Sequence, residues 1–109
     1  MPLGAHMSIA GGIGNALMRG KDVGCECIQI FTKSSNQWKV RPLADDDITG
    51  FRENKKITGI WPVVAHNAYL INLASPSEDL HKKSLDAMLL EMERAETLDI
   101  PFIIMHPGA

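Results

Sequence analysis

The stretch VVAHNAYLINLA, residues 63–74, begins as an apolar run of strand length that stops on a histidine. The same pattern recurs: PLGAH ends at His6, WPVVAH ends at His66 and PFIIMH ends at His106. A fourth apolar run of similar length, CIQIF, covers residues 27–31. Short apolar runs bounded in this way are typical of buried strands. The chain is therefore predicted to contain four strands, three of which close on an imidazole.

Segments with helical periodicity separate these runs. Residues 11–23 open with glycines, residues 45–57 begin with three aspartates that suit a helix N-terminus, and residues 77–98 follow a capping serine. The order β-α-β-α-β-α-β favours a parallel sheet with right-handed crossovers. The apolar side chains predicted to face the core are Ile48, Phe51 and Ile57 in the second helix, and Leu80, Leu85, Met88, Leu89, Met92 and Ala95 in the third.

The glycines near the start have a spacing that matches no nucleotide-binding fingerprint. Gly11, Gly12 and Gly14 are better interpreted as a helix start with tight strand–helix packing than as a phosphate cradle.

Composition sets broad bounds on the class of protein. The chain has 109 residues, 45% of them hydrophobic and 22% charged, as expected for one globular domain. A net charge of −2 gives no global indication of nucleic-acid binding. No signal peptide and no membrane-spanning stretch is evident, so we expect a cytoplasmic, nucleoid or nuclear protein without a membrane partner. Cys25 and Cys27 are expected to be reduced packing residues.

The histidines at strand ends indicate a site. Carboxyl ends of parallel strands share one edge, where ligands bind in barrels and open sheets alike, so His6, His66 and His106 are predicted to converge there. Taken singly, each is more often a structural histidine, but three in register favour a metal or catalytic site. Neutral imidazole is a good zinc ligand. His81 lies in the long helix and is expected to face solvent.

The segment TKSSNQWKVR, residues 32–41, is the one locally basic place. Lys33, Lys39 and Arg41 occur there without a neighbouring acid. Lysines beside hydroxyls and an aromatic side chain can form a surface that contacts phosphates. The alternative is a solvated loop in which Trp38 packs on the rim of the fold, and both interpretations stay open.

The segments GAHMSIAGGIGNA, IFTKSSNQWK, AHNAYLINLASP and IIMHPGA resemble, in order, the endonuclease IV family of apurinic/apyrimidinic endonucleases, from Leu3 to Ala109. The resemblance implies an α/β fold, a (β/α)8 TIM barrel that binds three zinc ions. Such a barrel needs about 250 residues. Residues 1–109 are therefore expected to form its amino-terminal half, one partial domain that stops after the fourth strand.

The resemblance also implies residue roles. His66 and His106 match two ligands of one zinc, and His6 matches a position that we expect to support a ligand through hydrogen bonds. The pair Tyr69 and Leu70 matches a wedge that enters the base stack, although packing against the next helix is an alternative. No catalytic residue beyond the metal ligands is implied. Further residues predicted to contact DNA are Lys33, Gln37, Lys39 and Asn36, the last standing where many members have an arginine.

The implied function is base excision repair by a deoxyribonuclease IV-type phosphoric diester hydrolase, a monomer at full length. It would cut double-stranded DNA on the 5′ side of abasic sites. The alternatives are a xylose isomerase-like sugar isomerase or epimerase, and a metal- or DNA-binding half-barrel without catalysis. The basic loop and YLINLASP favour the nuclease. Residues 1–109 alone are expected to be inactive, because most zinc ligands would be missing, and to self-associate through open edges.

Overall fold

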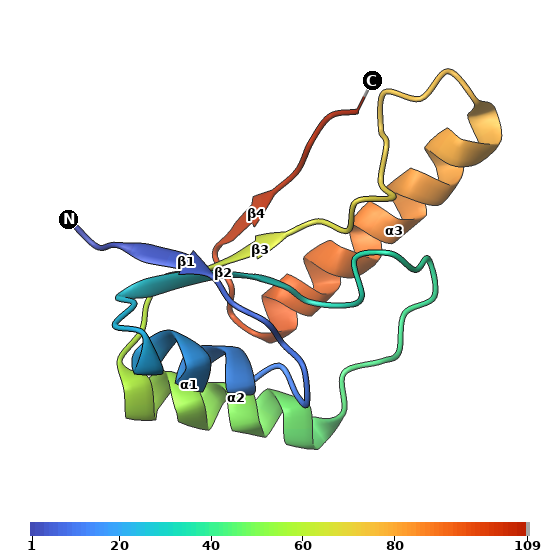
Figure 1. The fold of residues 1–109 in the computed structure, drawn as a ribbon. Coiled ribbons are helices and arrows are strands. Elements are labelled where there is room, and N and C mark those ends of the chain that lie inside the picture. Colours follow the sequence, from blue (N-terminus) through green and yellow to red (C-terminus); the bar gives the residue numbers. More distant parts are fainter. Residues whose placement is uncertain (109) are drawn as a thin grey trace.

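A computed structural model describes residues 1–108, and its four strands and three helices alternate along the chain. The elements are β1 (Gly4–His6), α1 (Asn15–Asp22), β2 (Cys27–Phe31), α2 (Asp45–Thr58), β3 (Val63–His66), α3 (Glu78–Thr97) and β4 (Phe102–Ile104). All neighbouring strands pair in parallel, in the order β1-β2-β3-β4. The helices lie on one side of this sheet (Figure 1). The α/β prediction is confirmed, because the strands form one four-stranded parallel sheet.

The core lies between the sheet and the helices. Burial alternates along β2 and β3, so that Ile28, Ile30 and Val63 face the helices. The alternate residues of these strands, Gln29 and Phe31 among them, project to the other face. The remaining core residues are Ile13, Ala16, Leu17, Phe51, Ile60, Ala65, Ala95, Leu98 and Ile100. This arrangement leaves the face opposite the helices for polar and aromatic side chains.

Gly14 allows α1 and α2 to approach closely. A Cβ atom at Gly14 would lie 2.9 Å from the carbonyl carbon of Gly50. The Asn54 side chain donates to the Gly14 carbonyl at 3.0 Å. The packing predicted for this glycine is therefore present, but it joins two helices. Close contact between helix and strand occurs instead at Gly20, where a Cβ would lie 2.8 Å from Ile28.

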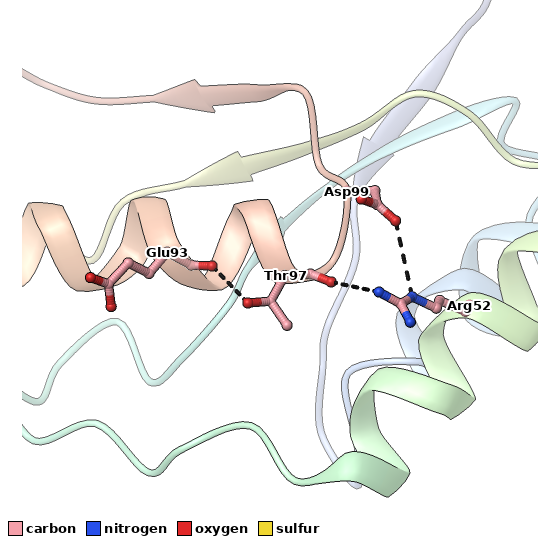
Figure 2. A network of polar contacts seen from close by, with 4 residues as sticks. All are labelled: Arg52, Glu93, Thr97 and Asp99. Carbon is pink, nitrogen blue, oxygen red and sulfur yellow. Dashed lines mark hydrogen bonds and ion pairs between the residues drawn. The ribbon is translucent and has the colours of Figure 1, made fainter.

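A polar network ties the end of α3 to α2 (Figure 2). Arg52 donates to the Thr97 carbonyl at 3.3 Å, and its Nε lies 4.0 Å from the Asp99 carboxylate. Thr97 in turn donates its hydroxyl to the Glu93 carbonyl at 2.9 Å. Asp99 has a φ of 57°, a left-handed conformation that turns the chain out of the helix towards β4. Because the ion pair is exposed, it contributes little to stability.

Part of the predicted apolar faces proved wrong. Ile57 is 69% exposed, and the exposed apolar residues of α3 include Leu85, Leu89 and Met92. The buried residues of α3 are Ala95, as predicted, and Ser84 and Glu91, which were not predicted. The physical reason is that the polar groups among them bond to loops: Ser84 Oγ accepts from the Asn72 N–H at 2.9 Å. Hydropathy alone assigns such residues to the solvent side.

Several smaller expectations are settled by the structure. Ser77 caps α3 by accepting from the Leu80 N–H at 3.3 Å. His81 is exposed as predicted, and its Nδ1 lies 2.9 Å from the Leu73 carbonyl oxygen. Cys25 and Cys27 are free. Within residues 1–108, none of the helices has the length and apolar character needed to cross a membrane. Ala109, the last residue of the predicted partial domain, lies outside the described residues.

Candidate functional site

The carboxyl edge of the sheet brings His66 and His106 together. His66 is the last residue of β3 and pairs in register with Ile104, so the chain after β4 runs alongside it. The Nε2 atoms of the two histidines lie 3.2 Å apart. At that distance two imidazole nitrogens can share a hydrogen bond or ligate one ion.

The local backbone selects the tautomer of His66. Its Nδ1 lies 2.7 Å from the Asn67 carbonyl oxygen. A carbonyl oxygen only accepts, so Nδ1 carries the proton and the Nε2 lone pair of the neutral ring faces His106. This is the pattern by which proteins orient a histidine ligand.

The pair fits two positions of a tetrahedral zinc site. Nitrogen ligands about 2.0–2.1 Å from zinc at a tetrahedral angle stand about 3.3 Å apart, close to the observed separation of His66 and His106. Within residues 1–108, His, Cys, Asp and Glu side chains do not gather in any group of three or more that could hold a metal ion. The described residues thus offer two ligands, and a complete zinc site needs more.

His6 lies at the same edge, and the Phe31 ring connects it to His66. Gln29 donates its side-chain amide to His6 Nδ1 at 2.9 Å. The His6 ring packs on Phe31, whose ring also contacts His66 at a centroid distance of 5.5 Å. Partial burial lowers the pKa of His6, and the charge of His66 adds to that shift. His6 therefore tends to stay neutral. Phe31, whose ring contacts His6, was not among the predicted site residues.

Tyr69 projects from the loop that follows β3. It is 65% exposed, and its ring makes T-shaped contacts with the rings of Phe31 and His66, at centroid distances of 5.2 and 5.9 Å. Its backbone N–H donates to the Ser35 carbonyl at 3.1 Å, which joins this loop to the one after β2. Leu70 is half-buried beside it. The ring is therefore available for contact while the backbone is held.

The basic loop divides into exposed and buried side chains. The side chains of Asn36, Gln37 and Lys39 are exposed. Lys33 is only 8% exposed, and its ammonium donates to the Ser34 carbonyl at 2.8 Å and to the Gln37 carbonyl. Burial lowers the pKa of Lys33, an effect that Glu91 opposes and Arg94 reinforces. In this position Lys33 holds the loop, and the expected direct phosphate contact is not available to it.

Trp38 favours the packing interpretation that the sequence left open. The Lys83 ammonium of α3 lies 4.8 Å from the centre of its ring. Trp38 also lines an apolar hollow of about 410 Å³ between this loop and the two longer helices.

Two residues of α3 were missed by the sequence analysis, the buried Glu91 and the half-buried Arg94. Glu91 is 3% exposed, and its two oxygens accept from the Ala68 N–H at 3.2 and 3.3 Å. Arg94 donates to the Arg41 carbonyl at 2.8 Å and to the Thr32 carbonyl at 3.1 Å. Burial raises the pKa of Glu91, although hydrogen bonds from Asn67 and Ala68 and the two nearby cations oppose the rise. Their spacing of three residues gave no clear signal, because α3 carries many other charged residues at similar spacing.

Known proteins share both the sequence and the fold. The chain is 48% identical over 106 residues to the probable endonuclease 4 of Chloroflexus aurantiacus, covering 97% of this chain and 37% of that protein. It is 50% identical over 107 residues to the probable endonuclease 4 of Geobacter sulfurreducens, covering 98% of this chain and 36% of that one. The chain therefore spans little more than a third of the length of these relatives.

Solved structures of known proteins have a similar fold. The crystal structure of endonuclease IV from Thermus thermophilus superposes with a TM-score of 0.90 at 32% identity, over 98% of this chain and 41% of that one. A D-psicose 3-epimerase superposes with a TM-score of 0.67 at 15% identity, over 94% of this chain and 37% of that one, and so shares the fold alone. The family described as xylose isomerase-like TIM barrel matches residues 18–109. The chain therefore belongs to the xylose isomerase-like TIM barrel family, and it resembles the endonuclease IV proteins.

Proposed function

We propose that this chain forms part of a zinc-dependent DNA-repair endonuclease that hydrolyses the phosphodiester 5′ to an abasic site. The observation that carries the proposal is the 3.2 Å separation of the His66 and His106 Nε2 atoms, at an edge from which Tyr69 projects. The similarity to proteins named endonuclease 4 supports the same conclusion. The rest of the zinc site, three ions with their other ligands, would come from polypeptide outside residues 1–109.

In this proposal the histidines hold metal and take no proton. The Asn67 carbonyl keeps the proton of His66 on Nδ1, so its Nε2 stays available as a ligand together with that of His106. Bound zinc supplies an activated water and neutralises charge on the phosphate. Among the described residues, we assign no other side chain to the chemical step.

The outer residues of two loops would bind the DNA. Tyr69 and Leu70 would enter the duplex where a base is missing, because unstacking costs least there. Asn36, Gln37 and Lys39 would follow the backbone beside them, with the smaller contact at Asn36 replacing that of an arginine. His6 would support the site through Gln29 and Phe31, without a direct bond to the metal. The full-length protein would act as a cytoplasmic monomer on double-stranded DNA.

The sugar isomerase alternative has only the shared fold in its support. A lysine at a strand end of the full-length protein, together with a sugar-sized pocket, would favour this alternative. Lys33 lies two residues beyond β2, but its ammonium is taken up by loop carbonyls.

The test measures zinc content and incision of a duplex with one tetrahydrofuran abasic analogue, using the full-length protein. We expect His66→Ala and His106→Ala to lose zinc and incision together, and Tyr69→Ala to keep zinc but bind DNA weakly. His81→Ala is the matched control, because this exposed histidine of α3 should retain both properties. Full zinc content and full incision in both His66→Ala and His106→Ala would contradict the proposal.

The isolated chain gives a second, simpler test. Residues 1–109 supplied with zinc should leave the abasic duplex intact, because the chain has only two of the ligands. The apolar side chains exposed on α3 and β4, such as Leu89 and Phe102, should make it self-associate. Incision by this chain, or a monomeric mass in light scattering at high concentration, would count against these expectations.

A further inference from the structure

Two neighbouring charged residues on the buried side of α3 each hold one loop of the candidate site. Glu91 and Arg94 are three residues apart, which places them side by side on a helix. Glu91 accepts from Ala68, in the loop after β3, and Arg94 donates to carbonyls of Thr32 and Arg41, at the two ends of the loop after β2. The site thus rests on one helical turn that contributes no ligand of its own.

The contact of Glu91 reaches His66 through a single peptide group. Glu91 accepts a hydrogen bond from the Ala68 N–H, and His66 Nδ1 contacts the Asn67 carbonyl oxygen. This N–H and this carbonyl belong to the same peptide unit. A peptide unit is planar and rigid, so holding its N–H fixes the direction of its carbonyl. A hydrogen bond from the N–H to a carboxylate also polarises the carbonyl and strengthens its own bond. Glu91 therefore bears on both the ring orientation and the basicity of His66.

The neighbouring loop is tied into the same arrangement. Arg94 fixes the ends of residues 32–41, and Ser35 within that loop accepts from the Tyr69 N–H at 3.1 Å. Tyr69 follows Ala68 directly in the chain. Glu91 and Arg94 therefore hold the backbone at Tyr69 from two sides. Loss of either contact would loosen Tyr69 without exposing the core.

We propose that Glu91 is a positioning residue that orients His66 as a metal ligand through the Asn67–Ala68 peptide group, while Arg94 steadies the adjoining loop. The inference rests on the proposed function, because it assigns His66 to zinc. A buried carboxylate is a poor source of stability, since removal from water disfavours its charge. Burial raises the pKa of Glu91, which agrees with a residue kept for geometry at some cost to folding.

The test compares Glu91→Gln with the matched control Glu96→Gln, an exposed glutamate five residues further along α3, in the full-length protein. Measurements are zinc affinity by competition with a chelator, hydrogen exchange of the Ala68 amide, and urea unfolding. We expect Glu91→Gln to weaken zinc binding about 10- to 100-fold, the usual effect of weakening a partner behind a ligand, because a neutral amide oxygen is a weaker acceptor than a carboxylate. Exchange at Ala68 should rise about tenfold, while the unfolding midpoint stays or increases. Glu96→Gln should change none of these.

A second variant keeps the inference testable if Glu91→Gln does not fold. Glu91→Asp keeps the charge but shortens the reach to Ala68, so it should lower zinc affinity as Glu91→Gln does. Wild-type zinc affinity in either folded variant overturns the inference, as does a loss of affinity that only parallels a loss of stability. None of these measurements uses DNA, so a protein that binds zinc through His66 without cutting abasic DNA would refute the proposed activity alone.

Discussion

The substitution Tyr69→Ala tests the wedge most directly. Tyr69 is 65% exposed, and its ring makes T-shaped contacts with the rings of Phe31 and His66. The bond from its N–H to the Ser35 carbonyl comes from the backbone and survives the substitution. The variant therefore removes a projecting aromatic surface and leaves the loop in place.

The expected loss can be estimated from the contact that the ring would make. Stacking of an aromatic side chain on a base contributes about 1–3 kcal/mol, as judged by alanine substitution. Since about 1.4 kcal/mol corresponds to a factor of ten, the dissociation constant for an abasic duplex should rise about 5- to 150-fold. The edge contacts within the protein contribute about 0.5–1.5 kcal/mol, so the free energy of unfolding should fall by no more than that. Affinity for an intact duplex should change less, because an intact duplex has no missing base whose place the Tyr69 ring could take.

The assay is fluorescence anisotropy with a labelled duplex that is either intact or carries one tetrahydrofuran site. Tyr69→Phe keeps the stacking surface and should bind nearly as wild type. Ile57→Ala removes an apolar side chain that is 69% exposed on α2, away from the carboxyl edge, and serves as the control. Wild-type affinity of Tyr69→Ala for the abasic duplex would refute the reasoning. An equal loss for both duplexes would also refute it, because the ring would then contribute nothing specific to the gap.

Three further predictions test the supports of the site. Gly14→Ala should lower the free energy of unfolding by about 1–3 kcal/mol in urea titrations, because its Cβ would lie 2.9 Å from Gly50. Lys39→Gln should reduce the salt dependence of DNA binding by about one counterion, whereas Lys33→Gln should leave that slope unchanged, because the Lys33 ammonium bonds to loop carbonyls. Burial raises the pKa of Glu91. The contribution of this residue to the free energy of unfolding is therefore complete below the ordinary carboxyl pKa of about 4.3. It is lost as the pH rises through the raised pKa of the native state. Urea midpoints of Glu91→Gln relative to wild type should therefore rise across that interval.

The arrangement of strands and helices could be predicted because it depends on patterns within short windows. Apolar runs that end at His6 and His66 coincide with strands β1 and β3, and Ser77 caps α3 as expected. The parallel order then placed the strand ends at one edge, which is why His66 and His106 could be expected to meet. Their separation could not be predicted, since it depends on how the chain turns after β4.

The differences from expectation concern side chains whose partners the hydropathy pattern does not encode. Lys33 has the sequence context of a solvated loop, yet its ammonium is folded back on carbonyls of that loop. The buried side of α3 was assigned to Leu85 and Leu89 because hydropathy ranks them above glutamate. Glu91 is buried only because the backbone of Ala68, 23 residues earlier, supplies a donor. A periodicity argument has no access to such a partner.

The disagreement at α3 is itself informative about function. An inner face of leucine would bury more apolar area and avoid removing a carboxylate from water, so stability does not explain Glu91. Its neighbours do, because the peptide group that it holds is the one that orients His66. Arg94, one turn further along, holds the loop on the other side of Tyr69. In this chain, charged residues on the sheet-facing side of α3 therefore indicate where the helix supports the site. Glu91 and Arg94 contact the two loops that carry every proposed DNA contact.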